Sequence, residues 1–477
     1  ISRQIWWGHR IPVFYRENEK RVSLQKPEPF KGWEQDPDTL DTWFSSALWT
    51  WSTLIDPELA KNHSLSLEDI LQRSPDFQKF HPTNIMETGY DILFFWVARM
   101  ILMTTYMLQE VPFKTVYLHG LIRTREGKKM SKSDPKSVID PLDSIEKYGT
   151  DALRIALVSG TGPGQDLRLY PEKMESSRRF ANKIWNAGRY ILLTIPVGTP
   201  ITAPKTVNSE LAKWLLHGLN DLIKDTQSRL ESHRLSDVAD NLKSFFWGNF
   251  CDWYLEMDKN PNRTHEDNQV IAFAFTTLIK MLHLYVPFVT EALWREFQQP
   301  KMLAVSEWPQ PLAYQFKASH QRIEIVKESI SQIRALREKA NIGLEIKIPA
   351  TLCSKVNVSI FKEHHNLIIR LARLKELNIS KKEPDTAKEL FGAYFNETFA
   401  SIDATFVDWK KEIQALQKKF ESESGFVEKS RKKLDNHGFL SNAPEKVVAD
   451  LRKKVIDVEK TLMALKKQIR DLEKLAS

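Results

Sequence analysis

The loop at residues 127–135, Gly-Lys-Lys-Met-Ser-Lys-Ser-Asp-Pro, has the residue types best suited to chemistry in this sequence. Two of its lysines, Lys129 and Lys132, are three residues apart among small residues. Two ammonium groups on a mobile loop can close over a bound triphosphate and stabilise charge on a departing pyrophosphate, without any covalent step. The loop alone would also fit an ordinary basic surface turn, so its meaning depends on the elements that position it.

A strand predicted at 113–118 ends at His119-Gly120, a few residues before this loop. In doubly wound α/β sheets, a strand followed by a glycine turn and a helix places ligands at the carboxyl end of the strand. Residues 92–107 have the pattern of a buried helix, and residues 1–30 read as strands and turns. Residues 62–79 read as a polar insertion with one short helix. The first 170 residues are therefore predicted to be α/β.

Helical periodicity dominates the next part of the chain. Helices are predicted at 173–193, 209–231, 236–258 and 268–297, which together indicate a helical bundle over 171–311. A small mixed α/β domain is predicted at 312–405, with a helix at 319–340, a strand at 346–353, a helix at 359–375 and weaker strands after it.

The basic charge of the chain is concentrated at its end. The formal net charge is +8, and residues 409–477 contain 17 Lys and Arg against 11 Asp and Glu. Apolar residues recur there at alternating spacings of three and four, interrupted by a turn-rich stretch at 435–441. This predicts an antiparallel coiled-coil hairpin over 406–477, which could lie along a phosphate backbone. A lysine-rich, solvated helix face is the alternative.

Composition excludes several other classes. A chain of 477 residues with 42% hydrophobic and 27% charged residues is neither disordered nor fibrous. Its two cysteines, Cys251 and Cys353, cannot form a disulfide framework or a cysteine-rich zinc site and fit a reducing compartment. The longest apolar window, 92–103, is shorter than the ~20 residues of a membrane span. We therefore expect a cytoplasmic protein with neither a membrane span nor a metal site.

Several segments resemble one family. Residues 129–133, Lys-Met-Ser-Lys-Ser, are similar to the KMSKS signature of class I aminoacyl-tRNA synthetases. The similarity is to valyl-tRNA synthetases at residues 1–12, 40–46, 88–97, 117–123, 138–142, 149–154, 164–166, 182–186, 250–254 and 439–445. Isoleucyl relatives share the KMSKS loop, and an isoleucyl-type synthetase stays the less favoured alternative.

The resemblance implies a fold and a function. The fold would be α/β plus all-α: the second half of a Rossmann-type catalytic domain at 1–170, a helical anticodon-binding domain at 171–311, the mixed domain at 312–405 and the coiled-coil arm at 406–477. The half-domain with the HIGH signature and the editing domain would lie upstream of the Ile start. The activity would be that of a monomeric valine–tRNA ligase using ATP with Mg²⁺, valine and tRNA-Val. By itself the chain would be inactive, and a non-catalytic tRNA-binding module is the alternative from another functional class.

The resemblance also implies roles for individual residues. Lys132 would contact ATP and Lys129 would assist with its phosphates, which makes these two the catalytic residues. The ATP site would also include Ser131, His119 and Gly120.

For valine, Trp43 would pack on the side chain, Asp91 would hold the ammonium group and Ile92 would add an apolar wall. The alternatives are purely structural roles: ordinary core packing for Trp43 and a helix N-cap for Asp91.

One helix of the predicted bundle offers groups for an unstacked RNA base. Lys183, Trp185, Asn186 and Arg189 fall within two turns and supply charge, stacking and hydrogen bonding. The resemblance implies tRNA contact for them, although we expect Trp185 to be in the core rather than on the RNA.

Overall fold

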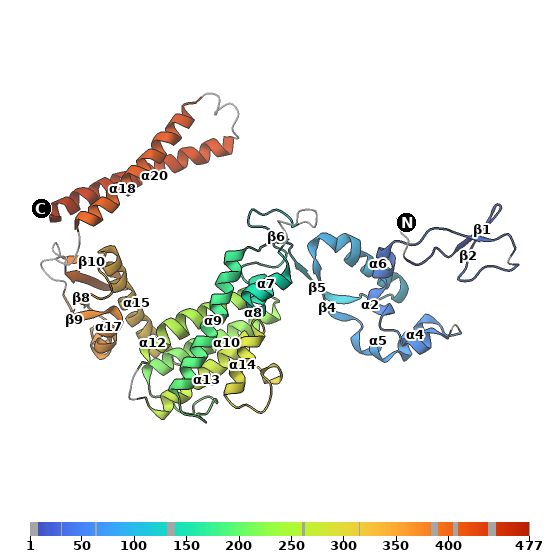
Figure 1. Cartoon of the computed structure of the whole chain (residues 1–477), viewed down its shortest axis with the longest axis horizontal. Helices are drawn as coiled ribbons and strands as arrows, with labels where there is room; N and C mark the ends of the chain where they lie inside the picture. The colour runs from blue at the N-terminus through green and yellow to red at the C-terminus, as the bar shows by residue number, and fades with distance from the viewer. Residues whose placement is uncertain are drawn as a thin grey trace. The chain divides into compact units, whose positions relative to one another are not determined.

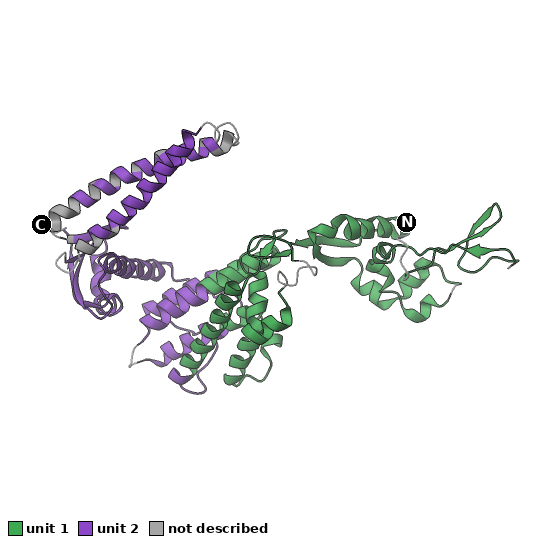
Figure 2. Ribbon diagram, turned by 45° about the horizontal axis from the view of Figure 1, so that its top comes forward, with its two compact units in different colours: residues 1–192, 222–244, 277–309 green, residues 193–221, 245–276, 310–477 purple. Residues whose placement is uncertain are grey.

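The computed structural model describes residues 8–29, 31–62, 64–130, 139–259, 263–313, 315–382, 390–403, 409–436 and 445–476. The chain divides into two compact units, coloured green and purple in Figure 2. The first comprises residues 1–192, 222–244 and 277–309, and the second comprises residues 193–221, 245–276 and 310–477. The four domain ranges expected from the sequence stay predictions.

The first unit opens with a small antiparallel sheet in the order β2-β1-β3. Its strands are β1 (Val13–Arg16), β2 (Glu19–Val22) and β3 (Glu34–Gln35). The indole of Trp33 is 2% exposed and lies under the guanidinium groups of Arg16 and Arg21, at 4.5 and 5.3 Å from the ring centre. The predicted strands and turns are thus confirmed for residues 13–22.

Five short helices follow this sheet. They are α1 (Thr42–Ala47), α2 (Trp49–Ser52), α3 (Pro57–Ala60), α4 (Leu67–Arg73) and α5 (Pro75–Phe80). The prediction of one short helix within 62–79 was wrong, because two are present. Ser74 has an extended backbone between them, and Pro75, which has no backbone N–H to donate, starts the second.

Two pairs of parallel strands position the ligand-binding candidates. β4 (Thr83–Gly89) pairs with β5 (Phe113–His119), and β6 (Ile122–Arg123) pairs with β7 (Leu167–Arg168). The connection from β4 to β5 runs through η1 (Tyr90–Ile92), the π-helical η2 (Leu93–Val97) and α6 (Ala98–Leu108). Met86, Val97, Met100 and Phe113 form the core between the strands and this helix. The predicted strand ending at His119 is confirmed.

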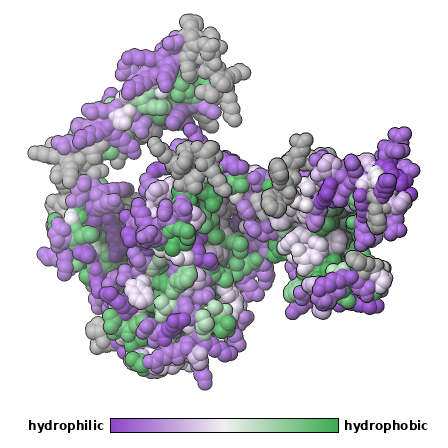
Figure 3. Space-filling model, turned by 45° about the vertical axis from the view of Figure 1, so that its right-hand side comes forward, coloured by the Kyte–Doolittle hydropathy of each residue, from purple (hydrophilic) through white to green (hydrophobic). Residues whose placement is uncertain are grey.

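The prediction that 92–107 is a buried helix was wrong. Phe94 is 81% exposed, Tyr106 is 77% exposed and Leu102 is 68% exposed. Only one face of the helix packs, because the sheet beneath it has two strands in the part of the chain that the structure describes. Figure 3 shows hydrophobic residues, in green, at the surface of the molecule.

Tyr90–Leu108 also has the length and apolar composition that a membrane crossing requires, a criterion that core helices of globular proteins satisfy equally. In this structure 17% of the apolar 18-residue window within this segment is buried.

Most of the middle of the chain is helical, as Figure 1 shows in green and yellow. The elements are α7 (Pro141–Tyr148), α8 (Thr150–Val158), α9 (Pro171–Thr194), α10 (Glu210–Glu231), α11 (Leu235–Ser244), η3 (Phe245–Tyr254), α12 (Leu255–Met257), α13 (His265–Leu282), α14 (Pro287–Glu296) and η4 (Leu303–Val305). The single helix predicted at 268–297 was wrong, because Pro287 starts a new helix there. The Asp151 carboxylate accepts hydrogen bonds from the amides of Phe288 and Val289 at this new N-terminus.

The second unit contains a mixed α/β region. Its sheet has the order β10-β11-β8-β9, with β8 (Ile348–Ser354) parallel to β9 (Leu374–Ser380) and antiparallel to β11 (Thr398–Asp403), which pairs with β10 (Leu390–Phe395). Three helices accompany it: α15 (Lys317–Lys339), α16 (Val358–Glu363) and α17 (His365–Ala372). The single helix predicted at 359–375 was wrong, because two helices are present with His364 between them. The second ends at Ala372, because Arg373 takes a left-handed backbone conformation with φ 54°.

Two long helices end the chain, α18 (Trp409–Leu434) and α20 (Glu445–Ala476), drawn side by side in Figure 1. Val427, Val455 and Leu465, which belong to the predicted apolar seam, are 5–8% exposed. Arg431 on α18 forms an ion pair with Glu459 on α20 at 2.6 Å. Two long helices are thus present on either side of the turn-rich stretch predicted at 435–441.

Candidate functional site

The carboxyl ends of β4 and β5 bring two of the predicted site residues together. Gly89 pairs with His119 in the parallel register. A Cβ at Gly89 would lie 2.8 Å from Asp91 Oδ1 and 3.4 Å from His119 Cε1, so both side chains use the space that this glycine leaves. The Nδ1–H of His119 donates to the Gly120 carbonyl at 2.8 Å, and its Nε2 is 3.4 Å from Glu87 Oε1. Asp91 and His119 therefore share one corner of the sheet.

Asp166 connects the segments at this end of the sheet. It was not among the predicted site residues. Its Oδ1 accepts hydrogen bonds from the Leu121 amide at 2.8 Å and from the Tyr90 hydroxyl at 3.0 Å, and Arg123 binds its Oδ2. The Leu121 amide contributes most to lowering the pKa of Asp166, followed by Arg123. Asp166 thus stays ionised and joins the segments after β4, after β5 and before β7. Its spacing in the sequence gave no signal of this role, because its partners are distant in the chain. The resemblance at residues 164–166 was the one signal that could have pointed to it.

Gly120 permits the close approach of two backbone segments. A Cβ on this residue would lie 1.8 Å from the Gln165 carbonyl oxygen, so only glycine fits. Beside it is a cavity of about 600 Å³. Its lining comes from the end of the parallel sheet, the segment before β7, the end of α8 and the start of α11. It includes Glu87, Tyr117, His119, Gly120, Thr161 and Gln165. Burial first, and then the charge of Glu87, raises the pKa of Tyr117, which keeps its hydroxyl neutral.

Trp43 lines a second cavity, of about 370 Å³. The Asp41 carboxylate accepts a hydrogen bond from the Trp43 amide at 2.9 Å and so caps α1. The Trp43 ring packs against Phe95 with 5.9 Å between ring centres. Phe95 is four residues after Asp91, so Trp43 is half-buried against the segment that carries Asp91 and Ile92.

Asp91 is not the N-cap of this segment, so that alternative was wrong. The turn η1 starts at Tyr90, is preceded by Gly89 and has no side-chain cap. Asp91 is exposed within the turn, and Ile92 is half-buried beside it.

The base of the lysine-bearing loop is anchored next to Asp166. Thr124 and Lys128 close a tight turn, in which the Thr124 amide donates to the Lys128 carbonyl at 2.9 Å. Lys129 then forms an isolated antiparallel bridge with Arg123, the residue that binds Asp166. Lys129 is therefore fixed at the site by backbone pairing. Ser131 and Lys132 lie outside the described residues.

The four residues predicted to contact tRNA share one side of α9. Asn186 and Arg189 are exposed, Lys183 is half-buried, and Trp185 is 43% exposed. The expectation that Trp185 belongs to the core was therefore wrong. The core face of α9 is formed instead by Phe180, Ile184, Ala187, Gly188 and Ile191, at the three- and four-residue spacing of a helix.

Three protein-family models match consecutive parts of the chain. Residues 25–170 match the class I tRNA synthetases for isoleucine, leucine, methionine and valine, and residues 212–352 match the anticodon-binding domain of tRNA ligases. Residues 408–473 match the tRNA-binding arm of valyl-tRNA synthetases. Together with the geometry at the ends of β4 and β5, these matches place the chain in the class I tRNA synthetase family.

Within that class, the chain belongs to the valyl-tRNA synthetases. It is 37% identical to the valine–tRNA ligase of Staphylococcus carnosus over 99% of its length, and 38% identical to that of Listeria monocytogenes over 96%. It is 34% identical to the Bacillus subtilis enzyme over 99% of its length. The chain covers 54%, 52% and 54% of these three proteins, and thus spans about half the length of the relatives it matches.

The fold is also similar to a solved structure. This is the LeuRS of Agrobacterium radiobacter K84 in a ternary complex with tRNA and LeuAMS, with a TM-score of 0.55 at 18% identity. The similarity covers 67% of this chain and 42% of the other. At this identity it supports the fold of the chain.

Proposed function

We propose that the chain is part of a valine–tRNA ligase, which activates valine with ATP as an adenylate and transfers it to tRNA-Val. The observation that carries this proposal is the 34–38% identity to valine–tRNA ligases over 96–99% of the chain. ATP would be bound with Mg²⁺ as a substrate.

For ATP, the support comes from the corner formed by Gly120 and His119. Backbone groups at the end of a parallel strand, next to a cavity of about 600 Å³, can accommodate a nucleotide. Lys129, held by its bridge to Arg123, would direct its ammonium group to the phosphates. Ser131 and Lys132, three residues or fewer further on, would close over the triphosphate and stabilise the departing pyrophosphate.

For valine, the support comes from an apolar surface beside a carboxylate. Trp43 and Phe95 offer aromatic faces to a branched aliphatic side chain, and Ile92 adds to them. Asp91 is exposed, and it approaches Gly89 from one side as His119 does from another, so its carboxylate is open to an ammonium group. The bound valine would then place its carboxyl group toward the proposed ATP-binding residues His119 and Gly120.

We expect that the chain alone does not catalyse adenylate formation. Phe94, Leu102 and Tyr106 are at least 68% exposed along one helix, above a sheet of two strands. A helix over a parallel sheet normally packs on further strands, so this face would be covered by the other half of a catalytic domain rather than by a membrane.

For tRNA, the support comes from two surfaces described separately. The exposed face of α9 combines Trp185 with Lys183, Asn186 and Arg189, and suits an unstacked base of the anticodon loop. Helices α18 and α20 would form an antiparallel coiled coil whose excess of six positive charges follows the tRNA backbone. We further propose that the enzyme acts as a cytoplasmic monomer, where both of its free cysteines, Cys251 and Cys353, stay reduced.

The test is a chimera in which this chain replaces the matching half of the Bacillus subtilis valine–tRNA ligase. The chimera should charge tRNA-Val with valine and should not charge it with leucine. The matched control is the same chimera with Lys132→Ala, which should fold normally and lose about 3 kcal/mol of transition-state stabilisation at little change in valine affinity. A folded chimera that charges no tRNA with valine would refute the proposal.

A further inference from the structure

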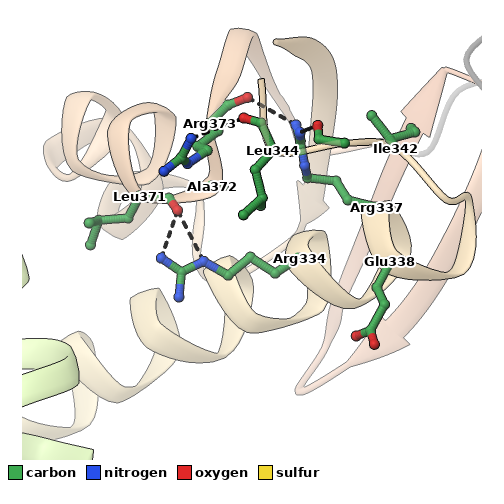
Figure 4. Close-up of a pocket in the computed structure, with 9 residues that line it drawn as sticks. Arg334, Arg337, Glu338, Ile342, Leu344, Leu371, Ala372 and Arg373 are labelled. Carbon is green, nitrogen blue, oxygen red and sulfur yellow. Dashed lines mark hydrogen bonds between the residues drawn. The ribbon is translucent and has the colours of Figure 1, made fainter. Parts of the chain in front are cut away.

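A pocket in the second unit gathers three arginines from two sides. It has a volume of about 550 Å³ and is lined by Arg334, Arg337, Glu338, Ile342, Gly343, Leu344, Leu371, Ala372 and Arg373, which we name the arginine pocket. Figure 4 shows Arg334 and Arg337 extending from one helix, α15, toward Leu371 and Arg373 at the end of α17. The pocket is far from the candidate site in sequence. Its residues 334–344 fall within the match to the anticodon-binding domain, which assigns no role to the pocket itself.

The floor of the pocket is buried and its rim is open. Arg337 is 3% exposed, and Leu371 and Ala372 are also buried. Leu344 is 64% exposed, and Arg334 and Arg373 are exposed as well. A ligand entering from solvent would therefore meet two guanidinium groups at the rim and a third at the floor, beside apolar surface.

Neutral backbone oxygens hold these guanidinium groups in place. Arg334 donates to the Leu371 carbonyl through Nε at 3.0 Å and Nη2 at 2.8 Å. Arg337 donates to the carbonyls of Arg373, Gly343 and Ile346 at 2.7–3.0 Å. Arg373 donates to the Leu344 carbonyl at 3.1 Å. These bonds orient the three groups without neutralising their charge.

The positive charge in the pocket is only partly compensated. Among the described residues, no carboxylate pairs with any of the three arginines within 4.0 Å. Glu338 lines the pocket, and the charges of Glu256 and Glu345 act on Arg334 and Arg337 from longer distances. Burial, and then the charge of Arg373, lower the pKa of both Arg334 and Arg337. Within the described part of the chain, Nε of Arg337 is buried without a hydrogen-bond partner. A bound anion would compensate the positive charge of these buried guanidinium groups and would offer an acceptor to Nε of Arg337.

We propose that the arginine pocket binds a phosphate group of an RNA strand. Guanidinium groups bind phosphate through several charge-assisted hydrogen bonds. The pocket is large enough for a whole nucleotide, and Ile342, Leu344 and Leu371 provide an apolar surface for its base or ribose. The choice of RNA over a free nucleotide rests on the proposed function.

Residue-resolved arginine labelling on the whole chain tests the proposal. Phenylglyoxal modification of each arginine would be followed by peptide mass spectrometry with an unstructured oligouridine RNA, with AMP, or with inorganic phosphate at matched ionic strength. RNA should slow the modification of Arg334 and Arg373 by about fivefold or more, given charge-assisted bonding. Arg295, whose side chain is 70% exposed on α14, is the unprotected control.

Substitutions in the pocket should change the protection of Arg334 in opposite directions. Arg373 has a left-handed backbone, which asparagine tolerates better than arginine, so Arg373→Asn removes the charge while preserving the turn. It should abolish the protection of Arg334, whereas Glu338→Gln should strengthen it. Lys375→Gln removes one exposed positive charge two residues away, outside the pocket, and should leave the protection unchanged.

Three outcomes would overturn the proposal. The first is equal modification of Arg334 and Arg373 with and without all three ligands. The second is protection by AMP or phosphate but not by RNA, which would refute the assignment to an RNA strand. The third is the same protection of Arg334 in Arg373→Asn as in Lys375→Gln. The labelling measurements need neither valine nor ATP. Their outcome can therefore be distinguished from a failure of the chimera to charge tRNA.

Discussion

The hydroxyl of Tyr90 donates a hydrogen bond of 3.0 Å to the carboxylate of Asp166, which is 76 residues later in the chain. The same carboxylate binds the Leu121 amide and Arg123, and Arg123 bridges to Lys129. Asp166 thus connects the turn that carries Asp91 with the base of the lysine-bearing loop. A substitution of Asp166 should therefore disturb both the turn that carries Asp91 and the lysine-bearing loop.

Replacing Asp166 tests this connection. Asp166→Asn keeps the size of the side chain but removes the charge that Arg123 faces. We expect pyrophosphate exchange by the chimera to fall about tenfold or more, because charge-assisted hydrogen bonds are lost. Tyr90→Phe removes one neutral donor and should have a smaller effect. Equal activity of Asp166→Asn and the parent chimera would contradict the role of Asp166.

Gly120 should not tolerate any side chain. A Cβ there would lie 1.8 Å from the Gln165 carbonyl oxygen, so Gly120→Ala must separate the segments before β6 and β7. We expect a loss of about 3 kcal/mol in the free energy of unfolding, measured with urea. The matched control is Gly162→Ala in the same cavity wall. Its nearest neighbour would be the Gln165 side chain at 3.5 Å, so it should change stability by less than about 1 kcal/mol. Similar losses in both variants would refute the argument.

Adjacent residues on α9 should separate stability from RNA binding. Ile184 is fully buried and Trp185 is 43% exposed. Ile184→Ala should cost about 2–5 kcal/mol of stability. Trp185→Ala should leave the urea midpoint almost unchanged and weaken binding of tRNA-Val by about 1–3 kcal/mol, the range for losing a stacked base. Filter binding checks the second expectation, and unchanged affinity would remove Trp185 from the proposed tRNA-contacting surface.

The charged arm should control the salt dependence of tRNA binding. Removing residues 409–477 takes away 17 basic and 11 acidic residues. Because phosphate contacts release counterions, we expect the slope of log affinity against log salt concentration to become shallower by about 2 or more. The comparison is the intact chain over the same salt series. An unchanged slope would assign the charge of the arm to solubility instead.

Stability should depend on pH through Asp258. Its carboxylate pairs with Arg263 at 2.7 Å, and each side chain is 9% exposed. Burial raises the pKa of Asp258 from 3.8 to about 7, so between these values the folded protein binds the proton more tightly than the unfolded chain does. Stability therefore falls as pH rises from about 4 to about 7 and this effect levels off above it.

Urea unfolding at pH 5 and pH 8 isolates this effect when Asp258→Asn is compared with the parent chain. The difference in unfolding free energy between the two proteins should change by on the order of 2 kcal/mol across this interval, in favour of the parent at the lower pH. Parallel pH profiles for the two proteins would show that Asp258 is already ionised in the folded state at pH 5.

Much of the local structure could be predicted from periodicity. The strand ending at His119 and the helices α9, α10 and α15 follow from apolar spacing, which reports which side of an element is buried. The same spacing was misleading for residues 92–107, since an apolar pattern does not say whether a partner is present to cover it. Trp185 was misassigned for a related reason, because its size favours the core although its position on α9 does not.

The site was only partly visible in the sequence. His119, Gly120, Asp91 and Trp43 were identified by resemblance, and the structure brings Asp91 next to His119. Asp166 was missed, since its partners meet only when β6 and β7 pair in parallel. The arginine pocket was missed for the same physical reason, because Arg334 and Arg373 come together only when α15 packs near the end of α17.

Amino-acid-dependent ATP–pyrophosphate exchange by the chimera tests the central claim most directly. It reports adenylate formation alone, before tRNA is needed, and therefore depends on the corner formed by Asp91, His119 and Gly120 and on the lysine-bearing loop. The account predicts exchange that depends on valine and that falls sharply with Lys132→Ala. Exchange that depends on isoleucine or leucine instead of valine, or that is equal with and without Lys132, would contradict it.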